Sequence, residues 1–362
     1  MKTGIVTFHS AHNYGASLQT WALQKTLQNM GITPVVINYR PAVIDRLYHP
    51  LYGYRGVKKQ IVRMGKALKG NHAQKRSRKY DAFIEKNFNL TKECHTFEEL
   101  KKEDFQLDAC IVGSDQVWNV QHTGGDPAYM LEFLKEGVRK ISYAASVGTD
   151  YLLPEYQTEF ERGLKDFSCI SVREESARPL IQNLTELPVE TTLDPTLLLD
   201  EKDYEQLRTP LPHKEKYIFV YMMEKNKEVI EFTNYISRLT GLPVIQRRPT
   251  RFFQNELESC FMETPDGFLD YIKEAEYVIT NSFHGTVFSI IYGKPFVSML
   301  HSDTGSRTKD LLRLLQLEDH LLQGGDRFLF ERFFIKDPDQ PRGLIQTYRK
   351  SSLDFLERAL KS

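Results

Sequence analysis

Residues 4–39 read GIVTFHSAHNYGASLQTWALQKTLQNMGITPVVINY, and this stretch decides the fold class of the chain. An apolar, β-rich run at 4–8 is followed by a loop that contains Gly15, and then by apolar residues at helical spacing until Gly31. A second β-rich run occupies 34–39. Because a strand, a helix and a strand in this order form a βαβ unit, the stretch predicts a parallel sheet.

The same alternation continues along both halves of the chain. In the first half we expect further strands at 108–114, 140–146 and 169–174, with 191–199 as the last piece of that half. In the second half we expect strands at 217–223, 243–246, 277–280 and 295–300, separated by helices at 226–240, 266–275 and 286–292. The pattern predicts an α/β protein with two doubly wound, Rossmann-like domains that face a cleft.

The boundary between the domains is expected in the polar segment 200–216, which holds Pro210 and Pro212 and has the character of a linker. A chain of 362 residues is also too long for one ordinary core. The expected parts are an N-terminal domain at 1–199, the linker at 200–216, a C-terminal domain at 217–343 and an amphipathic C-terminal helix within 344–362.

Composition narrows the class of protein. Lys plus Arg equals Asp plus Glu at 48 each, so the net charge is zero and nucleic-acid binding is not indicated. The N-terminus lacks the pattern of a signal peptide, and no apolar run is long enough to suggest a membrane span. The four cysteines are scattered without a CxxC motif, which fits a reducing cytosol better than disulfides or a zinc site. We therefore expect a cytoplasmic protein.

The segment 46–80 departs from the alternation because it is rich in Lys and Arg and holds no Asp or Glu. Within it, a helix at 55–70 is expected to carry apolar residues on one face and basic residues around that face. A basic amphipathic helix of this kind can bind an anionic membrane surface from the cytoplasmic side. The alternative is a solvated surface helix that packs on its own domain.

Polar residues follow several of the expected strands. In open α/β sheets, ligands bind beyond the carboxyl ends of the strands, where helix N-termini attract phosphate. In HSAHNYGAS (9–17), Gly15 allows a ligand to approach the backbone, although the loop is equally explained as a helix cap by Asn13 or Ser10. In VGSDQVWN (112–119), Asp115 could act as a general base, although an Asp at a helix start is usually a cap.

Two further strand ends carry a cation and a histidine. Arg173 in SVREESA (171–177) suits a carboxylate or phosphate, which a guanidinium binds in bidentate fashion, and the alternative is a structural ion pair. In VITNSFHGTVF (278–288), His284 stands at a strand-to-helix turn, where a histidine can exchange a proton near neutral pH. A lone histidine is more often structural, but small polar neighbours at such a turn favour a functional one.

Other cations follow strands of the second half, and several common motifs are missing. Arg307 precedes a helix, and Arg247, Arg248 and Arg251 follow the strand at 243–246. The chain has no GxGxxG after its first strand, no GxxxxGK[ST] and no HExxH. Hydride transfer, ATP hydrolysis and zinc proteolysis therefore lack their usual signatures. The residues alone predict an anion-binding cleft with a histidine.

Taken together, the motifs resemble the polysaccharide pyruvyl transferase family. They follow the family order over roughly the first 300 residues, and they read GIVTFHSAHNYGASLQTWALQ, VINYRP, IVGSDQVWN, SYAASVG, SVREESA, LDPTLLL and VITNSFHGTVFSIIYGKPFV. The resemblance implies a GT-B-like fold whose C-terminal helix packs back on the N-terminal domain. It also implies transfer of an enolpyruvyl-derived group from phosphoenolpyruvate to two hydroxyls of a sugar, with release of phosphate, in surface or capsular polysaccharide biosynthesis.

The resemblance also suggests roles for particular residues, with the acceptor on the N-terminal domain and the donor on the C-terminal domain. His284 is the candidate acid or phosphate contact, and Asp115 is the candidate base. The candidates for binding phosphoenolpyruvate are Arg173, Ser282, Gly285, Thr286 and Arg307. The candidates for the acceptor or the cleft are Asn13, Tyr14, Gly15, Ser114, Gln116 and Asn281. The chemistry requires no metal or other cofactor, and the acceptor saccharide could be lipid-linked.

Two other functions remain open from the sequence. The first is a nucleotide-sugar glycosyltransferase on the same GT-B fold, since GKPF (293–296) occurs in many glycosyltransferases. The second is a non-catalytic protein that binds a sugar or an anion in the cleft. The joint presence of His284, Arg173 and Asp115 argues against the second alternative.

Overall fold

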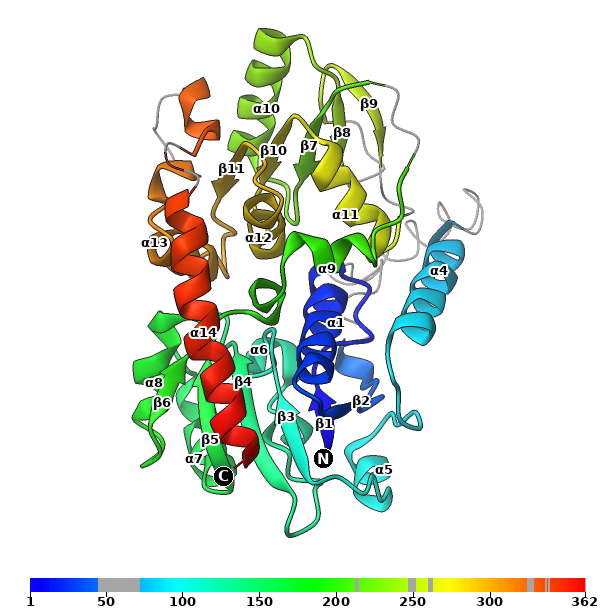
Figure 1. Cartoon of the computed structure of the whole chain (residues 1–362), viewed down its shortest axis with the longest axis vertical. Coiled ribbons are helices and arrows are strands. Elements are labelled where there is room, and N and C mark those ends of the chain that lie inside the picture. Colours follow the sequence, from blue (N-terminus) through cyan, green and yellow to red (C-terminus); the bar gives the residue numbers. More distant parts are fainter. Residues whose placement is uncertain are drawn as a thin grey trace.

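The computed structural model describes residues 1–44, 72–211, 215–246, 252–259, 263–323, 329–335, 337 and 339–361. Two lobes lie one above the other, each built around a parallel sheet (Figure 1). The expected basic helix at 55–70 and the three arginines Arg247, Arg248 and Arg251 lie outside the described residues. No described helix is both long and apolar enough to cross a lipid bilayer.

The N-terminal lobe contains a six-stranded parallel sheet in the order β2-β1-β3-β4-β5-β6. Its strands are β1 (Lys2–Val6), β2 (Thr33–Val36), β3 (Ala109–Val112), β4 (Arg139–Ala145), β5 (Phe167–Val172) and β6 (Val189–Thr191). Its helices are α1 (Tyr14–Asn29), α4 (His72–Asn87), α5 (Phe97–Lys102), α6 (Val120–Thr123), α7 (Gln157–Leu164) and α8 (Arg178–Gln182). Short 3₁₀ turns are η1 (Pro127–Met130), η2 (Pro154–Tyr156), η3 (Glu175–Ala177) and η4 (Pro195–Leu198).

The C-terminal lobe repeats the plan with the strand order β12-β11-β10-β7-β8-β9. Its strands are β7 (Ile218–Tyr221), β8 (Val244–Gln246), β9 (Glu256–Ser259), β10 (Tyr277–Thr280), β11 (Phe296–Met299) and β12 (Leu321–Leu322). The helices from the inter-lobe segment onward are α9 (Glu201–Glu205), α10 (Lys227–Thr240), α11 (Pro265–Glu274), α12 (Phe283–Ile291), α13 (Ser306–Leu314) and α14 (Asp339–Lys361). Its 3₁₀ turns are η6 (Glu318–His320) and η7 (Phe330–Phe333).

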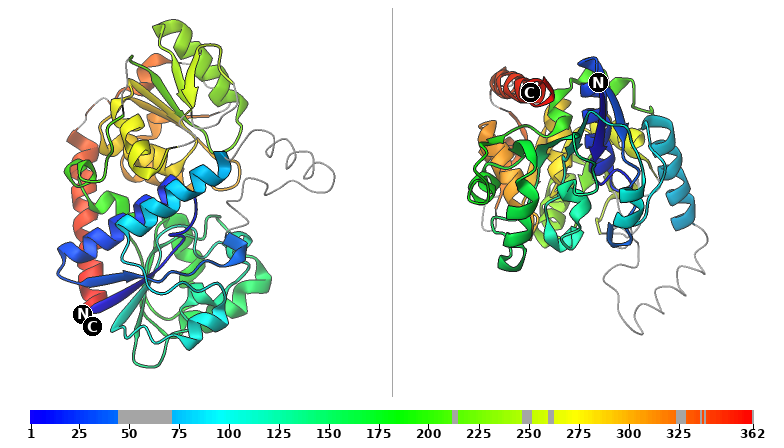
Figure 2. Two further views of the ribbon diagram at one scale, coloured as in Figure 1. Left: turned by 90° about the vertical axis from the view of Figure 1, so that its right-hand side faces the viewer. Right: turned by 90° about the horizontal axis from the view of Figure 1, so that it is seen from below.

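Helix α1 is buried on nearly every side because both lobes pack against it. It contacts η4 of its own lobe, and α11 and α12 of the other. Tyr14, at its first residue, stacks on Phe268 of α11 with ring centroids 4.7 Å apart. It also stacks on Tyr80 of α4, so α4 runs beside α1 between the lobes (Figure 2). The small and apolar residues of α1 therefore form part of the interface between the two lobes.

Helix α14 runs from the C-terminal lobe back along the N-terminal lobe (Figure 1). Ser352 Oγ accepts a hydrogen bond from the backbone N–H of Leu193 at 3.0 Å. Arg349 donates to the carbonyl oxygens of Leu197 and Leu199 at 2.8 and 3.0 Å. The last helix thus supports the segment that connects β6 to the second lobe.

The structure differs from the expected elements at several places. The stretch 191–199, for which no element type was expected, begins with the last residue of β6 and continues as the turn η4, which Asp194 caps. Helix α12 begins at Phe283, three residues before the expected start, because the Ser282 side chain accepts a hydrogen bond from the N–H of Gly285. His284 therefore lies inside the first turn of a helix. The short strands β9 and β12 were not expected, and the segment 200–216 contains the short helix α9.

Candidate functional site

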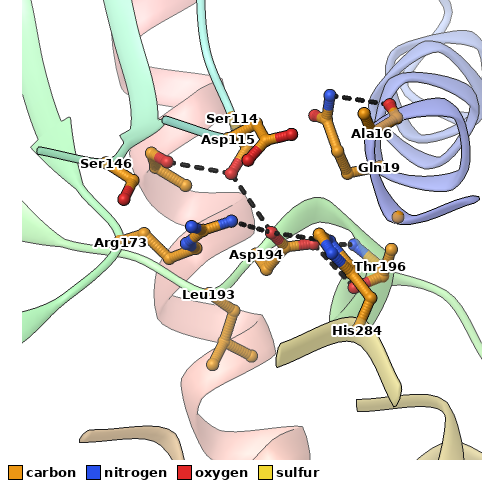
Figure 3. A network of polar contacts seen from close by, with 12 residues as sticks. Ala16, Gln19, Ser114, Asp115, Ser146, Arg173, Leu193, Asp194, Thr196 and His284 are labelled. Atoms are coloured by element: carbon orange, nitrogen blue, oxygen red, sulfur yellow. Dashed lines mark hydrogen bonds and ion pairs between the residues drawn. The ribbon is translucent and has the colours of Figure 1, made fainter. Parts of the chain in front are cut away.

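The loops after β3, β5 and β6 of the first sheet meet the start of α12 in the second lobe. Ser114, Arg173, Asp194 and His284 gather there in one polar network (Figure 3). Each of these four residues is at most 7% exposed. The carboxyl ends of parallel strands share one edge of a sheet, so residues far apart in sequence are brought together here.

His284 lies between the two lobes. Its Nε2 is 3.6 Å from Oδ2 of Asp194 in the N-terminal lobe. On the other side, its ring packs against Gly15 in the first turn of α1, where an added Cβ would lie only 2.0 Å from Nδ1. Gly15 is therefore required for the close approach of α1 to the histidine ring. The structure thus brings Gly15 and His284, which come from different lobes, into contact.

Asp194 lies at the centre of the network, and its side chain is fully buried. Oδ1 accepts hydrogen bonds from the N–H and the hydroxyl of Thr196 at 3.0 and 2.6 Å. Oδ2 accepts one from Nη1 of Arg173 at 2.9 Å. Burial alone raises the pKa of a carboxyl, but the neighbouring His284 and Arg173 hold the pKa of Asp194 well below its usual range. Asp194 is therefore an ionised carboxylate.

Arg173 follows β5 directly and is bound by two carboxylates. Besides the bond to Asp194, its Nε donates to Oε1 of Glu174 at 3.2 Å. Its Nη2 is buried and makes no hydrogen bond to the part of the chain that the structure describes. The guanidinium lies over the ring of Phe283, 4.4 Å from its centroid. Arg173 thus forms two buried ion pairs, and its Nη2 has no acceptor among the described residues.

Arg307, in the first turn of α13, approaches the same ring. Its guanidinium carbon is 5.8 Å from the centroid of Phe283. Its Nη2 donates to Oγ1 of Thr304 at 2.9 Å. Next to both arginines is a pocket of about 440 Å³ between the lobes. Its walls come from the loop after β5 and from β6, η4, α12, α13 and α14, and they include Arg173, Asp194, Phe283, Arg307, Asp310 and Tyr348.

Asp115 and its neighbours form the loop after β3. Ser114 Oγ lies 3.2 Å from Oδ2 of Asp194, so this loop joins the network. The Asp115 Oδ1 accepts a hydrogen bond from the N–H of Gln116 at 2.9 Å, and its backbone is left-handed, with φ of 69°. Gln116 in turn accepts a hydrogen bond from Asn119. Asp115 is 6% exposed, and its charge acts on both Arg173 and His122.

Three other candidate residues have internal roles. Asn13 caps α1 by accepting hydrogen bonds from the N–H groups of Gly15 and Ala16. Asn281 accepts a hydrogen bond from the N–H of Met223 at 2.7 Å and so joins the ends of β10 and β7. Tyr14, as described above, stacks between the lobes. These contacts explain the residues structurally, and a role in acceptor binding stays a prediction.

The turn at the start of α12 is also internally bonded. Ser282 is its cap, and Thr286 Oγ1 lies 2.6 Å from Oγ of Ser298 in β11. Gly285 packs against β10, where an added Cβ would lie 2.4 Å from Oγ1 of Thr280. These contacts fix the position of His284 relative to the sheet. Direct contacts from Ser282, Gly285 and Thr286 to phosphate stay a prediction.

The sequence reasoning missed Asp194, Glu174 and two histidines near the cleft. Asp194 had one signal, because it is the single charged residue of the apolar stretch LDPTLLL. Burial lowers the pKa of His122 to about 4, and its buried Nδ1 has no hydrogen-bond partner within the described ranges. His301, after β11, lies 3.8 Å from Glu224. Within the same ranges, no group of His, Cys, Asp and Glu is arranged to hold a metal ion.

The site can be compared with known proteins. A model of the polysaccharide pyruvyl transferase family matches residues 13–303, which include all four residues of the network. The chain belongs to the polysaccharide pyruvyl transferase family. A search of curated proteins gave no match. Membership of this family implies a transferase that acts on a saccharide acceptor.

The chain also resembles solved structures of two epimerases and a glycosyltransferase. UDP-GlcNAc 2-epimerase from Neisseria meningitidis aligns over 99% of this chain and 100% of its own, with a TM-score of 0.51 and 12% identity. The corresponding enzyme from Methanocaldococcus jannaschii covers 92% and 90%, with a TM-score of 0.43 and 11% identity. A glycosyltransferase from Streptomyces sp. SF2575 covers 98% and 96%, with a TM-score of 0.43 and 10% identity. The match to the Neisseria meningitidis enzyme, with a TM-score above 0.5, concerns the fold alone. Together with the two six-stranded parallel sheets, it identifies a GT-B-like fold with two Rossmann-like domains.

Proposed function

We propose that this protein transfers a pyruvyl group to a saccharide and uses phosphoenolpyruvate as its donor. Phosphoenolpyruvate carries a phosphate and a carboxylate, and guanidinium groups are suited to both. The observation that carries the proposal is the convergence of Arg173 and Arg307 on Phe283, the residue before His284. Two cations are thereby held beside one proton-exchanging side chain. We assign the phosphate and the carboxylate to these two arginines.

The proposed reaction needs one acid and one base. A proton is added to the methylene carbon of phosphoenolpyruvate, and positive charge develops at the carbon that bears the phosphate. An acceptor hydroxyl attacks that carbon and loses its proton, and the bond from the carbon to the phosphate oxygen breaks. A neighbouring hydroxyl then attacks the same carbon and loses its own proton, which closes the ketal. We assign the acid to His284 and the base to Asp115.

The acceptor is a saccharide of a surface or capsular polysaccharide, either free or linked to a lipid. A lipid-linked acceptor would place the enzyme at the cytoplasmic face of the membrane. The substrate-binding roles of Ser282, Gly285, Thr286 and the residues of the first two loops belong to the same proposal.

The proposal is tested by measuring phosphate release from phosphoenolpyruvate with a panel of galactosides, mannosides and lipid-linked saccharides. The expected product has the mass of the acceptor plus pyruvate minus water. Parallel reactions contain UDP- or GDP-sugars and are examined for nucleoside diphosphate. Release of nucleoside diphosphate without any phosphoenolpyruvate-dependent product would contradict the proposal and favour a glycosyltransferase.

A further inference from the structure

The orientation of the Asp194 carboxylate is fixed by its own turn. Its Oδ1 accepts two hydrogen bonds from Thr196, one from the N–H and one from the hydroxyl. Its carbonyl oxygen accepts a third bond from the N–H of Leu197 at 2.9 Å. Pro195, between Asp194 and Thr196, has a restricted backbone and stabilises this turn. The other carboxylate oxygen, Oδ2, therefore has a defined direction before any partner is considered.

Oδ2 meets groups from three other segments. Ser114 comes from the loop after β3, Arg173 from the end of β5, and His284 from the other lobe (Figure 3). A histidine contributed by one lobe is thus placed against a carboxylate contributed by the other. The distance of 3.6 Å to Nε2 is slightly longer than a hydrogen bond, and this contact needs only a small movement to tighten.

The carboxylate of Asp194 interacts with both the cation and the histidine of the network. Arg173 faces two carboxylates, those of Asp194 and Glu174, and both are buried. A carboxylate beside one ring nitrogen of a histidine determines which nitrogen carries the hydrogen and in which direction the ring points. Asp194 can therefore control His284 and Arg173 together without contacting the substrate.

We propose that Asp194 is a positioning residue, whose Oδ2 holds Nε2 of His284 and the guanidinium of Arg173 as one unit across the two lobes. Its effect on turnover rests on the proposed function, whereas its effect on the imidazole does not. Asp194 of the N-terminal lobe aligns His284 of the C-terminal lobe. The reacting groups are therefore correctly oriented only when the two lobes are in contact.

Ring ¹⁵N NMR of histidine-labelled protein tests the unit without any substrate. His284→Gln assigns the signals of His284, and Asp194→Asn removes the charge while keeping the shape. The wild-type ring is expected to carry its hydrogen on Nε2, and Asp194→Asn should change the ¹⁵N shifts of His284. Asp200→Asn, an exposed carboxylate six residues further along, is the matched control and should leave them unchanged. Identical His284 signals in wild type and Asp194→Asn would overturn the proposal.

Kinetics with phosphoenolpyruvate give the second readout. Asp194→Asn is expected to lower kcat by about 10²–10⁴-fold, the range for catalytic histidine–carboxylate pairs, with a smaller change in KM. Its kcat/KM profile against pH should also move to lower pH, because the buried network loses a negative charge.

Thr196→Val removes only the hydroxyl that orients Oδ1 and should lower kcat roughly three- to tenfold. If Asp194 had only a structural role, Asp194→Asn would lower the thermal stability and leave the dependence of kcat/KM on pH unchanged. If wild-type protein releases no phosphate, the proposed function fails, and the NMR experiment still decides the role of Asp194.

Discussion

At the scale of single residues, the first prediction concerns His284. If it donates the proton, His284→Ala should lower kcat by roughly 10²–10⁴-fold, the usual size of a general-acid contribution. His284→Gln should be nearly as defective, because glutamine can donate a hydrogen bond but cannot transfer a proton. Steady-state kinetics with varied phosphoenolpyruvate measure both. A raised KM, an almost unchanged kcat and partial rescue by glutamine would instead assign His284 to ground-state binding of phosphate.

The sequence identified some members of this network and missed its centre. His284 and Arg173 stood out because a histidine and a cation followed predicted strands, and the structure places both on Asp194. Asp194 itself was missed because its partners come from distant segments. Arg173 is 21 residues away and Ser114 is 80 residues away. An Asp before a proline is a common turn signal, and only the fold shows that its carboxylate is fully buried and shared.

At the scale of elements, α1 and α12 determine the position of the histidine, and Gly15 gives a prediction. A methyl group at Gly15 would collide with the His284 ring, so Gly15→Ala must displace either the ring or the helix. A misplacement of about 1 Å can cost roughly 10²-fold in rate, and we expect a loss of kcat of that order. Steady-state kinetics and thermal unfolding of Gly15→Ala are both measured, so that a loss of kcat is distinguished from a loss of stability.

The matched control for this change is Gly343→Ala in α14, where an added Cβ meets nothing within 4 Å. Alanine is the better helix former, so this variant should be as active as wild type and slightly more stable. Near-wild-type turnover in Gly15→Ala would mean that the close approach of α1 to His284 is not needed for activity.

Element types followed from the sequence better than element boundaries. The helix after β10 was placed three residues too late because Gly285 reads as a loop residue. In the structure Gly285 is helical, and its missing side chain lets α12 pack on Thr280. Strand β12 has two residues, too few for a periodic pattern to be detected. The packing of α1 between the lobes depends on the tertiary structure and has no local signal.

At the scale of the whole molecule, buried histidines make stability depend on pH. Burial lowers the pKa of His9 to about 4, and its Nε2 lies 3.0 Å from Oδ1 of Asn38. In the unfolded chain a histidine binds a proton near pH 6.5, so below that pH the unfolded state binds more protons than the folded state. Stability should therefore fall as the pH decreases from about 6.5 to about 4, and His9 alone should contribute about 3 kcal/mol.

Urea unfolding between pH 7 and 4.5 measures this effect. His9→Gln removes the titrating ring and keeps an amide that can reach Asn38, so its stability should depend less steeply on pH than that of wild type. His95→Gln is the control, since His95 is exposed. Parallel pH dependences for wild type and His9→Gln would rule out His9 as the source.

The last prediction concerns the way in which α14 joins the two lobes. Arg349 donates to the carbonyl oxygens of Leu197 and Leu199, beside the turn that carries Asp194. Arg349→Ala leaves these carbonyls without their donors, so it should cost about 1–3 kcal/mol of unfolding free energy. It should also lower kcat, because the turn that orients Asp194 loses its support.

Arg358 offers a comparison within the same helix. It pairs with Glu190 at 2.8 Å, but its side chain is 58% exposed. Water screens such a pair, so Arg358→Ala should change stability by at most about 1 kcal/mol and leave kcat unchanged. Urea unfolding and kinetics on both variants decide between two explanations of α14. Equal losses in both would mean that the helix contributes only general packing, whereas a loss specific to Arg349→Ala would show that it holds the Asp194 turn against the first lobe.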